Sequence, residues 1–268
     1  MHNIIKADFY KLIKSKAFWI NTILCIVFAV LMVTALNAGI SRAKNFPDRV
    51  MDDAEMRQMA AMGENISGVA ALTQFLPMGF NMIFVGVFVA IFISSEFSNG
   101  TMKNTLSRGA ERVKVFFSKF IVCSTAAIVM LLAFIATMLA AGSIAWGFDK
   151  AGTATFANML GMISLQALIM LAYTALFTFI SMTMRSSGGS IATNIICITM
   201  VSTLLGAISM LFGGSIKLGD YWLESALSKL AVLSPPSGDI LQGILIALGW
   251  GVASLAIGTT LFKKVDVK

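Results

Sequence analysis

The chain has 268 residues, of which 57% are hydrophobic and only 12% charged. A soluble globular domain carries about 25% charged residues, so the composition excludes that class and indicates an all-α polytopic membrane protein. Because each membrane-spanning helix needs roughly 20 apolar residues, the length has room for about six spans in a single domain, residues 1–268. The net charge of +7 fits cytoplasmic loops that face anionic lipid, and no nucleic-acid partner is expected.

Residues 1–16 are predicted to form an amphipathic helix in the cytoplasmic interface. Ile5 and Phe9 fall on one face, and Lys11 and Lys14 fall on the other. Two roles remain open for this helix. It is either a simple topological anchor or a connecting helix that also touches a cytoplasmic partner.

Six apolar runs follow, and each is expected to cross the membrane as a helix. They cover about 18–38, 75–94, 120–146, 159–184, 191–212 and 240–262. Pro77 and Gly79 are expected to bend the outer end of the second span. The three cysteines fall inside these runs, which predicts buried thiols rather than disulfides or metal ligands. They are Cys25, Cys123 and Cys197.

Two longer connections, 39–72 and 213–239, are expected outside the membrane. The first has balanced charges, and its composition predicts a helix from Asp52 to Met62. In the second, apolar residues alternate with charged ones before the chain breaks at Pro235-Pro236. This pattern predicts one or two short helices that lie in the outer interface or dip into it.

The distribution of basic residues sets the expected topology. Of the 20 Lys and Arg residues, thirteen fall in the segments proposed as cytoplasmic: four in residues 1–16, five in 95–119, one at Arg185 and three at the C-terminal end. Seven remain for the outer segments. The positive-inside rule then places both termini in the cytoplasm, and an even number of spans satisfies that placement.

The polar segment 95–119, with the sequence SEFSNGTMKNTLSRGAERVKVFFSK, separates the second and third spans. Its apolar residues recur at roughly helical spacing, so the segment is predicted to be folded and amphipathic. A folded basic loop on the cytoplasmic side of a membrane protein is a good candidate for docking a soluble partner. Glu96 is expected to brace this loop by pairing with Arg108 or Lys119.

The spans contain no Asp, Glu, Lys, Arg or His deep within them. Ion-coupled carriers usually need such groups, so an autonomous carrier or channel is disfavoured. The chain also lacks a GxxxxGK[ST] loop, so any ATP that drives it is bound by another polypeptide. Asn81, Gln166 and Asn194 are expected to form inter-helical hydrogen bonds or, together with Met82, to line a translocation path.

The layout of six spans, an interfacial N-terminal helix and a long first external loop resembles the type-2 permease subunits of ATP-binding-cassette exporters. Segment 95–119 also resembles the corresponding loop of these permeases. The shared pattern is Glu96, then Gly100-Thr101, then Leu106-Ser107-Arg108, and Lys119 at the start of the next span. Within this family, the chain is most similar to the small permeases of lantibiotic-immunity and bacitracin-type peptide exporters.

The resemblance implies a fold, a partner and a mechanism. Two permease subunits, identical or paralogous, would pair in the bacterial cytoplasmic membrane, each bound to an ABC ATPase that holds ATP and Mg. This chain would hold no cofactor and would not itself be an enzyme. The segment near Gly100 would be the coupling helix that seats on the ATPase. The residues assigned to that contact are Glu96, Gly100, Thr101, Met102, Lys103, Leu106 and Arg108.

The resemblance implies that Met102 and Leu106 insert as apolar anchors into the ATPase, while Lys103 and Arg108 pair with acids on its rim. The transported compounds would be amphipathic, such as antimicrobial peptides. A second hypothesis is a membrane scaffold or sensor that does not transport. In that case the basic loop would recruit a cytoplasmic regulator.

Overall fold

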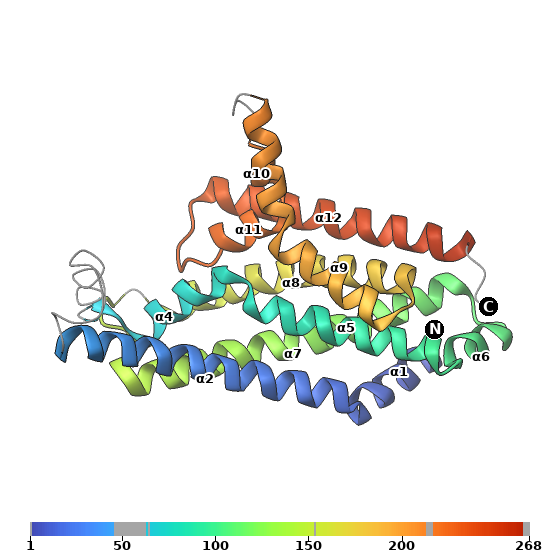
Figure 1. The fold of residues 1–268 in the computed structure, drawn as a ribbon, viewed down its shortest axis with the longest axis horizontal. Coiled ribbons are helices and arrows are strands. Elements are labelled where there is room, and N and C mark those ends of the chain that lie inside the picture. The colour runs from blue at the N-terminus through green and yellow to red at the C-terminus, as the bar shows by residue number, and fades with distance from the viewer. Residues whose placement is uncertain (1, 46–62, 64, 153, 213–216, 265–268) are drawn as a thin grey trace.

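The computed structural model describes residues 2–45, 63, 65–152, 154–212 and 217–264. These residues form helices and no strand, which confirms the all-α class. Five helices are long and apolar enough to cross a membrane, and they lie alongside one another in an elongated bundle (Figure 1). They are α2 (Lys16–Asn45), α5 (Phe80–Ser98), α7 (Arg112–Trp146), α8 (Phe156–Met184) and α12 (Ser237–Lys264).

The fifth expected span, 191–212, is two helices rather than one. Helix α9 (Ser187–Thr199) and helix α10 (Val201–Leu211) meet at a bend of 50°. Helix α10 projects away from the bundle (Figure 1). At its far end the Ser209 hydroxyl accepts a 2.9 Å hydrogen bond from the backbone N–H of Leu218, which ties α10 to the segment that follows.

Short elements occupy the expected second external connection. They are η2 (Leu218–Tyr221) and α11 (Leu223–Lys229), and α11 packs against α12, α8 and η1 (Leu76–Met78). The η1 turn and Gly79, whose φ is +68°, separate α4 (Gly68–Phe75) from α5. The helix is therefore interrupted at Pro77 and Gly79. The predicted helix from Asp52 to Met62 lies outside the described residues.

Two glycines allow α4 to cross α7 in close contact. A Cβ atom added to Gly142 would lie 2.8 Å from the Cα of Gly68. The N-terminus of α4 is fixed by the Ser67 side chain, which accepts a hydrogen bond from Ala70 N–H at 3.2 Å. The Gly68 N–H donates to the carbonyl of Gly147 at 2.8 Å. Close backbone approach of this kind needs small residues at the crossing.

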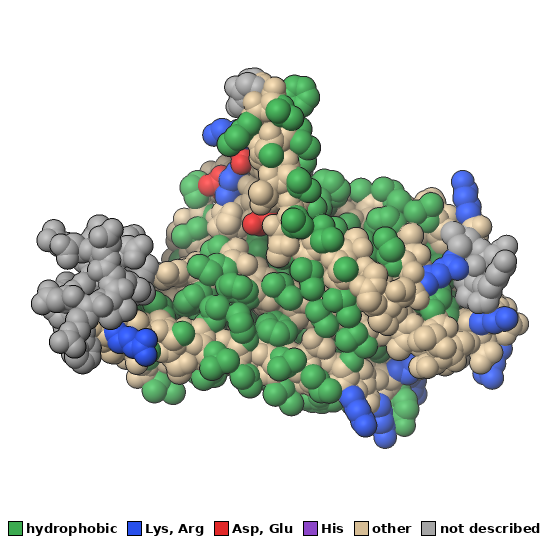
Figure 2. Space-filling view, in the orientation of Figure 1, with side chains coloured by type: hydrophobic (Ala, Val, Ile, Leu, Met, Phe, Trp, Pro, Cys, Tyr) green, Lys and Arg blue, Asp and Glu red, His purple; other side chains and the backbone are tan. Residues whose placement is uncertain are grey.

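The start of α1 (His2–Lys14) and the end of α12 lie at the same end of the bundle as α6 (Thr101–Ser107) (Figure 1). In Figure 2 apolar side chains are spread over the visible face of the bundle, and Lys and Arg side chains gather at this terminal end. Cys25 and Cys123 are buried free thiols, and Cys197 is a half-buried one.

Candidate functional site

The segment between α5 and α7 folds into a short helix held between two glycine turns. Helix α5 ends at Ser98, and Gly100 adopts φ +67°, a left-handed conformation that redirects the chain into α6. Such a conformation costs most residues about 1–2 kcal/mol but is freely available to glycine. Gly109, with φ +82°, makes the second turn before α7 begins at Arg112.

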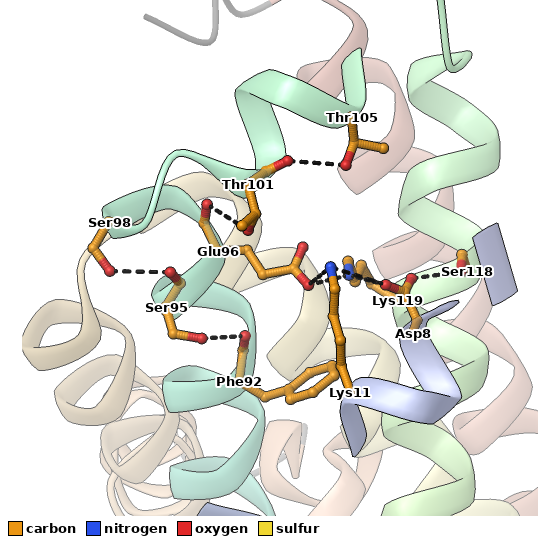
Figure 3. A network of polar contacts seen from close by, with 10 residues as sticks. All are labelled: Asp8, Lys11, Phe92, Ser95, Glu96, Ser98, Thr101, Thr105, Ser118 and Lys119. Atoms are coloured by element: carbon orange, nitrogen blue, oxygen red, sulfur yellow. Dashed lines mark hydrogen bonds and ion pairs between the residues drawn. The ribbon is translucent and has the colours of Figure 1, made fainter. Parts of the chain in front are cut away.

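Hydroxyl groups join α6 to the end of α5. The Thr101 hydroxyl donates to the carbonyl of Glu96 at 3.2 Å, and the Thr105 hydroxyl donates to the carbonyl of Thr101 at 2.9 Å (Figure 3). The Glu96 carbonyl belongs to the last turn of α5, where carbonyls lack intrahelical partners. Thr101 therefore satisfies one of these groups and fixes the start of α6 against α5.

The surface of α6 differs from the expected one at Met102. Its side chain is fully buried and packs into the main hydrophobic core, so in this structure it is not available as an anchor for a partner. Leu106 is half-buried, whereas Lys103 and Arg108 are exposed. The exposed surface of α6 is thus basic and polar rather than apolar.

Beneath α6 lies a buried ion-pair network that joins three helices. The Lys119 ammonium, on α7, donates hydrogen bonds of 2.6 Å to Oε1 of Glu96 on α5 and 2.6 Å to Oδ1 of Asp8 on α1 (Figure 3). The residues are 2% (Lys119), 7% (Glu96) and 2% (Asp8) exposed. Of the two alternatives expected for Glu96, the structure shows the pair with Lys119.

Further contacts complete the network. Lys11 donates to Oε1 of Glu96 at 3.0 Å, and Ser118 donates to Oδ2 of Asp8 at 2.7 Å. The Lys119 nitrogen also lies 5.7 Å from the centre of the Phe92 ring, within the range of a cation–π contact. Two ammonium groups thus balance two carboxylates, a condition that a buried charge cluster needs to be tolerated.

Sequence reasoning missed Asp8, although the helical pattern held a signal for it. Asp8 lies three residues after Ile5 and four before Leu12, so it falls on the apolar face of an amphipathic helix. An acid on such a face predicts a buried partner. Here that partner is Lys119, which lies 111 positions away in the sequence.

A cavity of about 560 Å³ opens beside the network. It lies between α1 and the turn from α6 to α7, and its lining includes Asp8, Glu96 and Lys119 together with Arg108 and Gly109. The buried charges therefore border a hollow at the terminal end of the bundle, next to the exposed basic side chain of Arg108.

The start of α7 is also joined to the end of α12. The Arg112 guanidinium donates to the carbonyls of Phe262 at 3.3 Å and Lys263 at 3.0 Å. A cation on the last carbonyls of a helix stabilises its C-terminus. Helix α6 is thus joined to α5 directly, and the residues that flank it link α5 and α7 to α1 and α12.

The four residues considered for a translocation path are all fully buried. The Gln166 amide donates to the carbonyl of Leu227 at 3.1 Å, and the Asn194 amide donates to the carbonyl of Gly86 at 2.9 Å. These two make the inter-helical hydrogen bonds expected for them, α8 to α11 and α9 to α5. Asn81 has no hydrogen-bond partner among the described residues, and Met82 belongs to the core. A path-lining role for the four stays a prediction.

Residues 4–206 match the family described as "ABC-2 family transporter protein". This match covers α1, the network, α6 and the helices as far as α10. No curated protein matches the chain.

Proposed function

Because the chain belongs to the ABC-2 family of transporter proteins, a family of membrane permeases, we propose that it is the permease subunit of an exporter powered by a separate ABC ATPase. The α6 segment is the surface that the ATPase contacts. The single observation that carries this proposal is the hydrogen bond from Thr101 of α6 to the backbone carbonyl of Glu96, whose carboxylate lies in the buried network with Lys119 and Asp8.

The attachment gives the proposal a mechanical basis. Protein interiors transmit displacement because they are closely packed, and α6 sits on a cluster whose ion pairs are costly to separate. Movement of α6 therefore shifts α1, α5 and α7 together rather than bending a flexible loop. ATP-driven closure of the ATPases then changes which side of the membrane the spans open to.

The charge on α6 specifies the chemistry of the ATPase surface. Lys103 and Arg108 are exposed, so the matching groove carries acidic side chains that steer and orient docking. Since Met102 is buried in the permease itself, apolar anchoring at this interface rests on Leu106 alone. Glu96 acts as a positioning residue because its carboxylate fixes the end of α5 to Lys119 of α7, next to the point where Thr101 attaches α6 to α5.

The remaining parts of the proposal follow the family likeness. Two permease copies, identical or paralogous, bind two ATPase subunits that hold ATP and Mg. The bundle lies in the bacterial cytoplasmic membrane with its terminal end in the cytoplasm, which agrees with the Lys and Arg side chains gathered there. The compounds expelled are amphipathic, with antimicrobial peptides as the leading class.

Co-purification tests the contact between α6 and the ATPase. The tagged permease is expressed with a candidate ABC ATPase subunit from the same organism, and the captured ATPase is quantified. Gly100→Pro, which blocks the left-handed turn, and Arg108→Glu are both expected to reduce capture at least several-fold. Arg42→Glu, an exposed arginine near the end of α2, is the matched control. Capture that is equal in all three variants would disprove the role of α6.

A further inference from the structure

Two hollows lie side by side at η2, away from the network. The first is a polar recess of about 600 Å³ between α10 and α11, and the second is an apolar groove of about 590 Å³ along α12. Asp220 lines the recess, and its neighbour Tyr221 lines the groove. Lys229 of the recess donates to Oε1 of Gln242 in the groove at 3.2 Å. The two hollows therefore share a wall.

The recess carries two charges of each sign. Its lining includes Lys217, Lys229, Asp220 and Glu224. Oε2 of Glu224 is buried and has no hydrogen-bond partner among the described residues. In Figure 2 the acidic side chains visible on this face lie beside α10. A buried carboxylate oxygen without a partner is costly, so a donor such as an ammonium group would stabilise it.

The groove runs along one face of α12, where two glycines and an alanine lie in line with two leucines. Gly238, Leu241, Leu245, Gly249 and Ala253 follow one another at helical spacing along it. Nothing lies within 4 Å of a Cβ added at Gly238 or Gly249, so the glycines leave the floor open. At a rise of 1.5 Å per residue, residues 238–253 span about 22 Å, which exceeds the roughly 15 Å that one leaflet contributes to a 30 Å hydrocarbon core.

One wall of the groove is fixed in place. The Trp250 indole N–H donates to the carbonyl of Tyr221 at 2.9 Å, and the Trp250 ring meets the Trp222 ring edge-on at 4.7 Å. Helix α12 is long and apolar enough to cross the membrane, and Leu241 and Leu245 of the groove are exposed, so the open side of the groove is suited to contact with hydrocarbon. A preformed apolar slot in that setting fits an acyl chain.

We propose that the two hollows together bind one zwitterionic phospholipid of the outer leaflet. Its phosphate and ammonium groups pair with the two lysines and two carboxylates of the recess, and one acyl chain lies in the groove against Trp250. The charge balance of the recess selects a zwitterionic head over an anionic one. The site needs neither nucleotide nor ATPase, but its place in the outer leaflet rests on the proposed topology, in which the terminal end of the bundle lies in the cytoplasm.

Tryptophan quenching by brominated lipid tests the site in the full chain. The protein is placed in phosphatidylglycerol vesicles in a Trp19→Phe, Trp146→Phe background, which leaves Trp222 and Trp250. A small mole fraction of phosphatidylcholine brominated on one chain is then added. Quenching is expected to exceed, several-fold, the value set by that mole fraction, and brominated phosphatidylglycerol is expected to quench less.

Two variants and a control separate the parts of the site. Gly249→Phe fills the groove and is expected to return quenching to the mole-fraction value. Val252→Phe, at an exposed position on α12 outside the groove, is expected to change nothing. Paired Lys217→Gln and Glu224→Gln changes are expected to remove the preference between head groups.

Three results would overturn the proposal. The first is quenching that follows mole fraction in the parent protein. The second is equal quenching by the two head groups. The third is efficient disulfide cross-linking of two copies through Leu245→Cys, which would show that a second copy covers the groove instead.

Discussion

Replacing Lys119 by methionine removes the only fully buried cation of the network while preserving much of the side-chain volume. Asp8 and Glu96, which are 2% and 7% exposed, then share Lys11, whose side chain is 41% exposed. Breaking a buried ion pair by removing one partner costs about 3–5 kcal/mol because the other charge stays buried and unpaired. For a chain of this size that corresponds to a fall in the unfolding temperature on the order of 10 °C.

A second ion pair in the same segment supplies the control. Lys114 and Glu111 also lie 2.6 Å apart, but their side chains are 46% and 65% exposed. An exposed pair contributes about 0–1 kcal/mol, so Lys114→Met is expected to leave the unfolding temperature nearly unchanged. Lys114 and Lys119 lie in the same segment and form ion pairs of the same length, so the comparison isolates the effect of burial.

Thermal unfolding of the purified protein in one detergent measures both effects. Neutralising the carboxylates with Asp8→Asn and Glu96→Gln in the Lys119→Met background is expected to restore more than half of the lost stability, because no uncompensated charge then stays buried. If Lys119→Met and Lys114→Met lower the unfolding temperature equally, or if the triple variant is less stable than Lys119→Met alone, the reasoning is refuted.

Two further predictions concern glycines. Gly142→Val is expected to destabilise the protein by about 1–3 kcal/mol, as overpacking does, because the new Cβ would lie 2.8 Å from the Cα of Gly68. Thermal unfolding measures this effect. An unchanged unfolding temperature would contradict the close crossing of α4 and α7. Gly100→Ala is expected to destabilise the protein by about 1 kcal/mol, because Gly100 adopts the left-handed φ of +67°. Gly188 lies within α9, so Gly188→Ala is expected instead to stabilise that helix by up to about 1 kcal/mol. Denaturation of the two variants side by side tests the pair, and the opposite order would refute the turn assignment.

The helical class and the folding of segment 95–119 could be predicted because apolar run length and helical spacing are local properties of the sequence. The sequence predicted that Glu96 pairs with one of two basic residues, Arg108 or Lys119. The choice of Lys119 depends on how α1, α5 and α7 pack, which no local pattern states. Met102 was misplaced for a related reason, since a helical stripe shows that a side chain is apolar but not which surface it meets.

The bend between α9 and α10 was not predicted because the sequence carries neither proline nor glycine where it occurs, at Met200. Tertiary contacts with η2 accompany it, including the Ser209 hydrogen bond. The recess at Asp220 and Glu224 was not predicted from the sequence, because two acids in a polar connection are typical of a solvent-exposed loop. Only the fold shows that they share a hollow with two lysines.

Site-specific cross-linking tests the central claim, that α6 is the surface on which the ATPase docks. A photo-reactive residue is placed at Lys103, exposed on α6, and in a separate variant at Met210, exposed on α10. Illumination of cells that also express the ATPase captured by the permease is predicted to join that ATPase to position 103 and not to position 210. Absence of an ATPase adduct at position 103, or an equal adduct at position 210, would contradict the account.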